Sequence, residues 1–340
     1  MCLWTQPAAV VCASMTPLPI SAFAPGRVNL IGEHTDYNRG LCLPFAVELG
    51  VTVTVERRAG GEIAAAGLPG DDPYLRGAIA ELRAAGVELP GCALEVSSDL
   101  PQNAGLGSSA ALCVALVLAL RAAAGADRVA PVELAMLCSR IENEHAGAET
   151  GLLDQLAALL GQAGQALRLD MWTLEAQPVQ LDLRGHELAV LGSGAPRALA
   201  ASGYNERRAE CRHAAELLGV ESLREASDPS GLPDPLDRRA RHVMSENVRV
   251  DEAVAALKDG RMATLGELLD ASHASLRDNY EVSVPEVERA VDACREAGAL
   301  GARIMGGGFG GSVVALFPPD RALPESAIRV HAGAGARLLC

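Results

Sequence analysis

Three short segments combine glycine with polar side chains of the kind that bind phosphate and hydroxyl groups. They cover residues 25–40, 103–111 and 306–312. The middle segment reads Asn103-Ala-Gly-Leu-Gly-Ser-Ser-Ala-Ala111 and leads into an apolar stretch typical of a buried helix. Backbone amides at a helix N-terminus attract anions, and glycine removes the Cβ atoms that would hold a phosphate away. An ordinary helix-start loop with serine caps has the same composition, so this segment alone leaves phosphate binding open.

The common nucleotide-binding motifs fit the middle segment poorly. Residues 105–110 satisfy the dinucleotide pattern G-x-G-x-x-G/A, but Asp127 follows a helix rather than the second strand that this pattern requires. Walker loops and protein kinases place a lysine on the nucleotide phosphates. The single lysine of the sequence, Lys258, has no glycine loop before it. Any nucleotide chemistry here must therefore neutralise phosphate with backbone amides, arginine and metal ions.

Composition and charge narrow the class of protein. The chain has 340 residues, of which 49% are hydrophobic and 21% charged, as in globular proteins. This length exceeds the usual size of one hydrophobic core and favours two packed domains. The 43 acidic residues outnumber the 29 basic ones, giving a net charge of −14 that repels a polyphosphate backbone. We therefore expect no nucleic-acid partner.

The cysteines and the uncharged segments indicate where in the cell the protein is expected to reside. The nine cysteines are dispersed without a C-x-x-C pair, which argues against disulfides or zinc and for buried thiols in a reducing cytoplasm. Residues 1–26 carry no charge, but they lack a basic leader region and contain several prolines, so we expect no signal peptide. Met15 is an alternative start to Met1. Within the uncharged stretch 101–120 only the second half is continuously apolar, so no membrane span is expected.

Hydrophobic periodicity predicts mixed strands and helices that would position the three segments. Strands are expected at 20–24, 51–56, 93–98, 166–171, 179–182, 188–191, 302–305 and 312–317. Helices are expected at 73–85, from the middle segment to 124, and at 132–144, 152–160, 203–218, 235–258, 261–277 and 284–297. We place a domain boundary near residue 183, which gives an N-terminal domain over 1–183 and a C-terminal domain over 184–340. The mixture predicts an α+β or α/β protein.

The three segments together resemble the three motifs of the GHMP small-molecule kinases, and within that superfamily those of the galactokinases. Residues 26–38, Gly-Arg-Val-Asn-Leu-Ile-Gly-Glu-His-Thr-Asp-Tyr-Asn, resemble the galactokinase signature. Residues 103–111 resemble the ATP loop, and residues 306–311 resemble the C-terminal glycine loop. Further similar stretches lie at 151–155, 204–208, 238–243 and 272–285. The resemblance thus covers about residues 20–317.

The resemblance implies a fold and a reaction. The implied fold is the two-domain α+β GHMP kinase fold, with a ribosomal-protein-S5-like N-terminal domain containing a left-handed βαβ unit and a ferredoxin-like C-terminal domain. The implied reaction is ATP-dependent phosphorylation of the anomeric hydroxyl of galactose to galactose 1-phosphate, the entry to the Leloir pathway, with Mg²⁺. A cytoplasmic monomer without a membrane partner is expected. Two alternatives stay open: a related sugar-1-kinase acting on arabinose, N-acetylgalactosamine or a uronic acid, and a non-catalytic galactose sensor.

The resemblance also assigns the catalytic roles. Asp154 matches the catalytic aspartate, which would orient or deprotonate the anomeric hydroxyl, although an isolated acid there would be explained by the helix dipole alone. Arg27 matches the catalytic arginine, which would pair with Asp154 and balance charge on the transferring phosphoryl group. A turn arginine in a surface salt bridge is the alternative for Arg27.

The remaining assignments concern binding. The sugar-contact positions are Glu33, His34, Asp36, Gly151 and Tyr204. The ATP-loop positions are Gly105, Leu106, Gly107, Ser108, Ser109 and Ala110. Ser109 and Glu142 are expected to hold Mg²⁺, with Glu144 as a rival for Glu142. The other acids and the cluster Arg238–Arg241 are interpreted as solvated helix faces.

Overall fold

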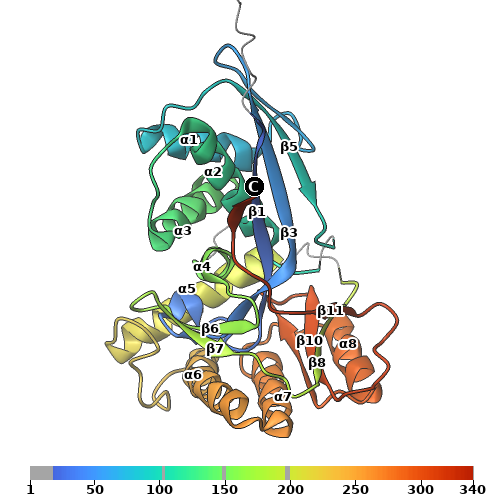
Figure 1. The fold of residues 1–340 in the computed structure, drawn as a ribbon. Helices are drawn as coiled ribbons and strands as arrows, with labels where there is room; N and C mark the ends of the chain where they lie inside the picture. The colour runs from blue at the N-terminus through green and yellow to red at the C-terminus, as the bar shows by residue number, and fades with distance from the viewer. Residues whose placement is uncertain (1–17, 102–103, 148–150, 196–199, 340) are drawn as a thin grey trace, which may run out of the picture.

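The computed structural model describes residues 18–101, 104–147, 151–195 and 200–339 (Figure 1). Asn103 and the alternative start Met15 lie outside the described residues. The strands are β1 (Ile20–Asn29), β2 (Leu41–Cys42), β3 (Pro44–Arg57), β4 (Ile63–Ala66), β5 (Cys92–Ser98), β6 (Gln165–Asp170), β7 (Glu175–Gln180), β8 (Glu187–Gly192), β9 (Gly301–Met305), β10 (Ser312–Phe317), β11 (Ile328–Val330) and β12 (Arg337–Leu339). The helices are α1 (Pro73–Ala84), α2 (Ser108–Ala124), α3 (Pro131–Arg140), α4 (Leu153–Leu160), α5 (Ala200–Leu218), α6 (Leu236–Asp259), α7 (Met262–Asp278) and α8 (Pro285–Glu296).

The first sheet has the strand order β12-β1-β3-β5-β4, and helices α1 to α3 lie on one side of it (Figure 1). Along β3 the residues Val51, Val53 and Val55 are buried and alternate with the less buried Thr52 and Thr54. This is the period-two pattern of a strand with one face on the core. The valines join a cluster that includes the residues of α2, which contacts both β1 and β3.

Strands β1 and β3 extend well beyond the predicted ranges 20–24 and 51–56. Their antiparallel pairing continues through Arg27 opposite Ala46 and Asn29 opposite Pro44, after a register shift between Pro25 and Arg27. We expected turns from residue 25 onward because proline and glycine punctuate that stretch. The register shift accommodates Pro25 and Gly26, and the strand continues beyond them, as it does past a β-bulge. As a result, Arg27 lies on a sheet strand rather than on a turn.

The second sheet has the antiparallel order β11-β8-β10-β9, with α7 and α8 packed against it. A third, three-stranded sheet, β2-β6-β7, sits beside α6. The predicted helix at 132–144 is α3 followed by a π-helical turn, η2, over Ile141–His145. The strands β2, β4, β11 and β12 were not predicted, because each has at most four residues and too few positions to show a period.

Helix α2 is the buried helix that the apolar run at 110–120 predicts. Ten of its residues are buried, including Ala110, Leu116 and Leu120. It ends at Gly125, whose left-handed backbone suits a residue without a Cβ atom. Among the helices of the described part of the chain, none combines the length and apolarity that a membrane crossing needs.

The end of the chain returns to the first sheet. Strand β12 pairs antiparallel with β1 at its edge, so residues 337–339 complete a sheet otherwise formed within 1–183. Just before it, the N–H groups of Gly333, Gly335 and Ala336 donate to the carbonyls of Ala46, Gly161 and Ala158, which lie in β3 and at the end of α4. The C-terminal segment therefore spans both halves of the molecule.

Candidate functional site

Arg27 and Asp154 form an ion pair with two parallel hydrogen bonds. Arg27 Nε lies 2.8 Å from Asp154 Oδ1, and Arg27 Nη2 lies 2.7 Å from Asp154 Oδ2. Asp154 is in the first turn of α4 and keeps 26% of its side chain exposed, whereas Arg27 keeps 11%. Each carboxylate oxygen has a second lone pair. The carboxylate is therefore fixed in orientation and still able to accept a bond from a ligand hydroxyl.

The same arginine holds the glycine loop that precedes α2. Arg27 Nη1 donates to the Gly105 carbonyl at 2.6 Å, and the backbone N–H of Arg27 donates to the Leu106 carbonyl at 2.8 Å. A Cβ atom on Gly26 would lie 2.6 Å from the Leu106 oxygen, so only glycine permits this approach. A Cβ atom on Gly107 would lie 3.2 Å from Arg27 Nη1 and 3.3 Å from an Asp154 oxygen. Loop, arginine and carboxylate are thus in contact.

The N-terminus of α2 is prepared for an anion. The residue before the helix, Gly107, has a left-handed φ of 72°, and in the described part of the chain no side chain caps the helix. Its first N–H groups and its positive dipole end are therefore available to a phosphate. Ser108 and Ser109 of this turn border a cavity of about 350 Å³. The lining of that cavity also includes Val51, Gly67, Leu68, Tyr74, Val96, Ser97, Ser98 and Leu112.

Of the two expected magnesium ligands, Ser109 lines this cavity, whereas Glu142 is not among its lining residues. Glu142 is 1% exposed, lies in η2 and accepts a hydrogen bond from Gln155. Burial and the charge of Glu142 raise the pKa of Tyr74, a cavity residue, to about 12. The rival acid, Glu144, is exposed. In the described residues no group of three or more histidine, cysteine or acidic side chains could hold a metal, so an ion here would take most ligands from phosphate and water.

Glu33 is a buried carboxylate held from the second half of the chain. Its Oε1 accepts hydrogen bonds from Arg303 Nη2 and from the backbone N–H of Gly306, both at 2.8 Å. Burial raises the pKa of Glu33, and the Arg303 guanidinium opposes this shift. The C-terminal glycine loop, which begins at Gly306, is therefore joined directly to the turn at residues 32–36.

His34 lies against aromatic rings with one ring nitrogen unused. Its Nδ1 is 2.7 Å from the Tyr37 hydroxyl, while Nε2 is buried without a hydrogen-bond partner among the described residues. Burial lowers the pKa of His34 well below its ordinary value, so the ring is neutral. The ring of Tyr204, on α5, lies 5.5 Å from that of His34, and a Cβ atom on Gly307 would lie 3.1 Å from Tyr204. Nε2 is therefore a buried polar atom with unused hydrogen-bonding capacity.

Asp36 and Gly151 are neighbours in space. A Cβ atom on Gly151 would lie 2.1 Å from Asp36 Oδ2, so the carboxylate approaches this backbone closely and a larger residue would displace it. Burial raises the pKa of Asp36 to about 6, the negative charges of Glu33 and Asp154 add to the shift, and Arg208 opposes it. The predicted sugar positions therefore share one region with the predicted catalytic pair.

Helix α6 holds the backbone of this turn, a role that the sequence analysis missed. Glu246 Oε1 accepts from the N–H groups of Gly32 and Glu33 at 3.0 and 3.4 Å, and His242 Nε2 lies 3.1 Å from the Glu33 carbonyl oxygen. Burial lowers the pKa of His242 to about 4, so the neutral ring donates to that carbonyl. Burial opposes ionisation of Glu246, but Arg249 brings its pKa down to about 2. The four-residue spacing of His242 and Glu246 on one helix face was the available signal.

The interpretation of Arg238–Arg241 as a solvated helix face is wrong at Arg239. This side chain is 1% exposed and donates to Glu210, to Glu281 and to the Asn279 carbonyl. The interpretation of the remaining acids as solvated is likewise wrong at Glu246, which is fully buried. A buried charge requires paired partners, and here they come from distant segments.

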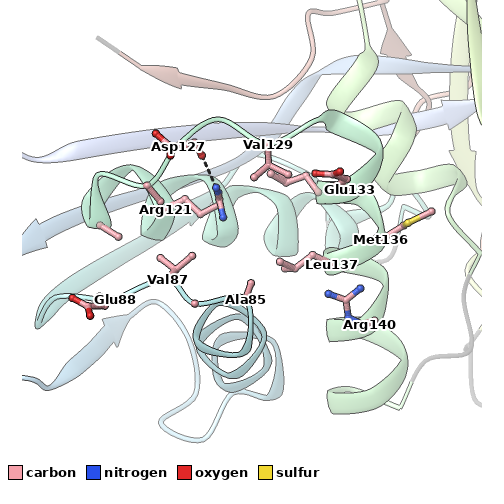
Figure 2. Close-up of a pocket in the computed structure, with 14 residues that line it drawn as sticks. Ala85, Val87, Glu88, Arg121, Asp127, Val129, Glu133, Met136, Leu137 and Arg140 are labelled. Carbon is pink, nitrogen blue, oxygen red and sulfur yellow. Dashed lines mark hydrogen bonds between the residues drawn. The ribbon is translucent and has the colours of Figure 1, made fainter.

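A larger hollow, of about 630 Å³, contains none of the predicted site residues. Figure 2 shows it between the ends of α1 and α2 and the side of α3. Helix C-termini carry partial negative charge, and the acids Glu88, Asp127 and Glu133 line the hollow as well. Arg121 donates to the Asp127 carbonyl, and Arg140 is paired with Glu81. These charges disfavour a phosphate there.

Comparisons with known proteins agree with this geometry. The family model "GHMP kinases N terminal domain" matches residues 73–162, "Galactokinase galactose-binding signature" matches 14–57, and "GHMP kinases C terminal" matches 253–330. A galactokinase from Mycobacterium tuberculosis is 43% identical over 90% of this chain and 91% of its own length. A galactokinase from Thermotoga neapolitana is 41% identical over 86% of this chain and 88% of its own length.

Solved structures show the same likeness. The crystal structure of Lactococcus lactis galactokinase complexed with galactose superposes with a TM-score of 0.86 at 32% identity and covers 95% of each chain. The mevalonate kinase of Methanococcus jannaschii superposes with a TM-score of 0.66 at 19% identity, over 94% of this chain and 99% of its own, and shows likeness of fold alone. The two-domain α+β fold is confirmed.

Proposed function

Because this chain belongs to the galactokinases of the GHMP kinase family, we propose that it transfers the terminal phosphoryl group of ATP to the anomeric hydroxyl of galactose. One observation carries the proposal. Arg27 is paired with both oxygens of Asp154 and also donates to the Gly105 carbonyl of the phosphate loop. The group that accepts a proton and the loop that holds a nucleotide therefore share one guanidinium.

Asp154 is proposed to orient the anomeric hydroxyl and to accept its proton. As the hydroxyl oxygen bonds to the γ-phosphorus, the bond between this phosphorus and the bridging oxygen breaks, ADP departs, and the proton passes to the carboxylate. The open lone pair on each Asp154 oxygen supports this role, because Arg27 occupies only one site per oxygen. Holding the acceptor in place lowers the entropic part of the barrier.

Arg27 is proposed to fix Asp154 and to place positive charge beside the transferring group. Its position at the edge of the glycine loop supports this role, since the loop is where the phosphates would lie. The fixed fork of a guanidinium serves two carboxylate oxygens and one carbonyl at once. Charge that is already in place costs no reorganisation when the transition state forms.

ATP is proposed to bind at the loop of residues 105–110 and in the cavity beside it. The uncapped start of α2 supports phosphate binding, and the partly apolar lining of the cavity supports binding of a base. Galactose is proposed to contact Glu33, His34, Asp36, Gly151 and Tyr204. Their mixture of carboxylates, a neutral imidazole and an aromatic ring supports recognition of a polyol by several hydrogen bonds and one apolar face.

Mg²⁺ is proposed to be held by Ser109 and Glu142. A serine hydroxyl at the cavity and a buried carboxylate near Tyr74 are hard oxygen donors of the kind that this ion takes. When bound, the ion would neutralise charge on the β- and γ-phosphates. Gln155, which donates to Glu142, fixes the direction of that carboxylate and is the neighbour of Asp154 in sequence.

A cytoplasmic monomer remains the expectation from the sequence. The six cysteines that the structure describes without a disulfide, Cys42, Cys92, Cys113, Cys138, Cys211 and Cys294, are all buried, which supports a reducing compartment. Sedimentation of the purified protein tests the monomer, and a single species of about twice the chain mass would contradict it.

The proposal is tested by ADP release with Mg²⁺ and ATP against galactose, 2-deoxygalactose, glucose, arabinose, N-acetylgalactosamine and galacturonate. Phosphorus NMR of the product identifies the phosphorylated carbon. Turnover confined to galactose and its close analogues, with a 1-phosphate product, is the expected result. Turnover with a different sugar and none with galactose would change the assigned substrate. Galactose binding without ADP release would contradict phosphoryl transfer.

A further inference from the structure

Arg303 is a charged residue in the middle of an apolar strand. It lies in β9 between Ala302 and Ile304, all three fully buried. A buried charge is costly unless its hydrogen-bonding groups are satisfied. The strand alone does not explain why an arginine stands there, and no motif in the sequence assigns it a role.

The guanidinium of Arg303 is engaged on all three of its nitrogens. Nε donates to the Leu30 carbonyl at 2.9 Å, and Nη1 donates to the Ile304 carbonyl at 3.0 Å. Nη2 donates to the Asn29 carbonyl at 2.9 Å and to Glu33 Oε1 at 2.8 Å. Lysine has three donors on one atom and cannot reach groups spread around a planar fork. The site therefore requires arginine specifically.

Two hydrogen bonds to the Glu33 carboxylate, from Arg303 and from the Gly306 N–H, end on the same oxygen, Oε1, and the side chain of Asn29 also interacts with this carboxylate. A carboxylate oxygen accepts about two hydrogen bonds, so Oε1 is filled. A sugar hydroxyl that binds Glu33 must therefore use Oε2. The guanidinium holds the Asn29 carbonyl and Oε1, and the Gly306 N–H of the glycine loop holds the same Oε1, so Oε2 has a fixed direction.

We propose that Arg303 is a positioning residue for sugar recognition, which fills Oε1 of Glu33 and so directs Oε2 to a single hydroxyl of galactose. The inference rests on the proposed function, because it concerns how the sugar site of that reaction is built. It assigns a specificity role to a residue of the C-terminal sheet that reaches the sugar through Glu33.

The first test is Arg303→Lys in the full-length protein. Lysine keeps the positive charge but loses the fork, so Glu33 is no longer held from a fixed direction. We expect the KM for galactose to rise about tenfold or more, as loss of a charged hydrogen bond does. The KM for ATP should stay unchanged and kcat should stay within about threefold, because Arg27 and Asp154 do not contact Arg303.

The second test maps the hydroxyl with monodeoxy galactoses. For Glu33→Gln, one monodeoxy galactose should have the same KM as galactose itself. The hydroxyl that this sugar lacks is the one that Oε2 contacts. In Arg303→Lys, removal of that same hydroxyl should no longer raise the KM, whereas removal of any other hydroxyl should raise it as in the wild type. If Arg303→Lys raised the KM by the same factor for galactose and for every deoxy sugar, the proposal would be overturned, because the effect would then be a general loss of packing.

Arg239→Lys is the matched control. Arg239 is as buried as Arg303 and also lies in the C-terminal half, but its partners are Glu210, Glu281 and the Asn279 carbonyl. It should lower the melting temperature to a similar degree without a selective change in the KM for galactose. A galactose effect in Arg239→Lys equal to that in Arg303→Lys would contradict the inference.

If Arg303→Lys does not fold, the pair Glu33→Met and Glu33→Met/Arg303→Met replaces it, because both charges are then removed together. The double variant should match Glu33→Met in its KM for galactose, and a further tenfold rise would refute the role. Wild-type protein that does not phosphorylate galactose would refute the proposed function instead, so the two failures are distinct.

Discussion

Arg27 and Asp154, 127 positions apart in the chain, are joined by hydrogen bonds of 2.8 and 2.7 Å to the two oxygens of one carboxylate. The arginine comes from a strand of the first sheet and the aspartate from the first turn of α4. The pairing fixes the direction of the carboxylate relative to the glycine loop, because the same guanidinium also binds the Gly105 carbonyl. The proposed proton acceptor and the proposed nucleotide loop are therefore held by one guanidinium.

Asp154→Asn is predicted to reduce kcat by about 10²- to 10⁴-fold, the range for loss of a general base. Asparagine keeps the size of the side chain but takes up no proton, so binding of ATP and galactose should persist in calorimetry. Asp251→Asn is the control, since Asp251 lies in α6 and is paired with Arg168 of β6 at 2.7 Å. Near-normal turnover of Asp154→Asn would remove the role assigned to this residue.

Arg27→Lys is predicted to lower kcat by about 10²-fold, in the range seen when one charge-stabilising donor is lost. An ammonium group cannot serve both Asp154 oxygens and the Gly105 carbonyl together. Steady-state kinetics measure the effect, with Arg168→Lys as the equivalent change in an ion pair remote from the site. Equal kcat values for the two variants would show that the fork is not needed.

Gly26→Ala is predicted to destabilise the protein by about 1–3 kcal/mol, as overpacking of a tight contact does. The added Cβ atom would lie 2.6 Å from the Leu106 oxygen and would displace the glycine loop, so the KM for ATP should rise as well. Urea unfolding and ATP-dependent kinetics measure both effects. Gly192→Ala, where a Cβ atom meets nothing within 4 Å, should change neither.

Ser109→Ala is predicted to raise the Mg²⁺ concentration for half-maximal activity about tenfold, as changes at metal sites do. The reason is the loss of one of the two proposed protein ligands. Ser97→Ala, at another hydroxyl that lines the same cavity, should leave the magnesium dependence unchanged. Identical magnesium curves for wild type and Ser109→Ala would place the ion elsewhere.

The galactose dependence is predicted to change with pH through Asp36. Since the pKa of Asp36 is raised to about 6, its carboxylate becomes protonated below that pH and loses one acceptor for a sugar hydroxyl. The kcat/KM for galactose should fall as the pH drops from about 7 to about 5. Asp36→Asn should lower kcat/KM at neutral pH and remove this acidic limb.

The same group affects stability with the opposite sign. Between its ordinary pKa of 3.8 and its folded pKa of about 6, Asp36 binds its proton more tightly in the folded state. The folded state therefore binds more protons than the unfolded state, and the free energy of unfolding falls as the pH rises through this window. Urea unfolding between about pH 4 and pH 7 measures the contribution of Asp36, as the difference between wild type and Asp36→Asn.

The sequence predicted the helices well, because each shows a period over enough residues, but it predicted only about half of each of the long strands β1 and β3. It did not predict β4, β11 or β12, since a strand of three or four residues depends on the neighbour that it pairs with. The motif resemblance named Arg27 and Asp154, but only the folded chain brings them to 2.7 Å. Arg239 and Arg303 show the limit most clearly. Apart from the Ile304 carbonyl next to Arg303, their partners lie 29 to 274 positions away, where no local pattern reaches.

The pairing of β12 with β1 also sets the order in which the molecule can be completed during synthesis. The first sheet begins with residue 20, yet its edge strand is residues 337–339, which leave the ribosome after every other described segment. A nascent chain of 183 residues contains Arg27, the glycine loop and Asp154 but exposes the open side of β1. Domains often finish folding as they emerge, N-terminal first. Here one edge of β1, at residues 21–23, stays open until residues 337–339 have been made, although its other edge already pairs with β3.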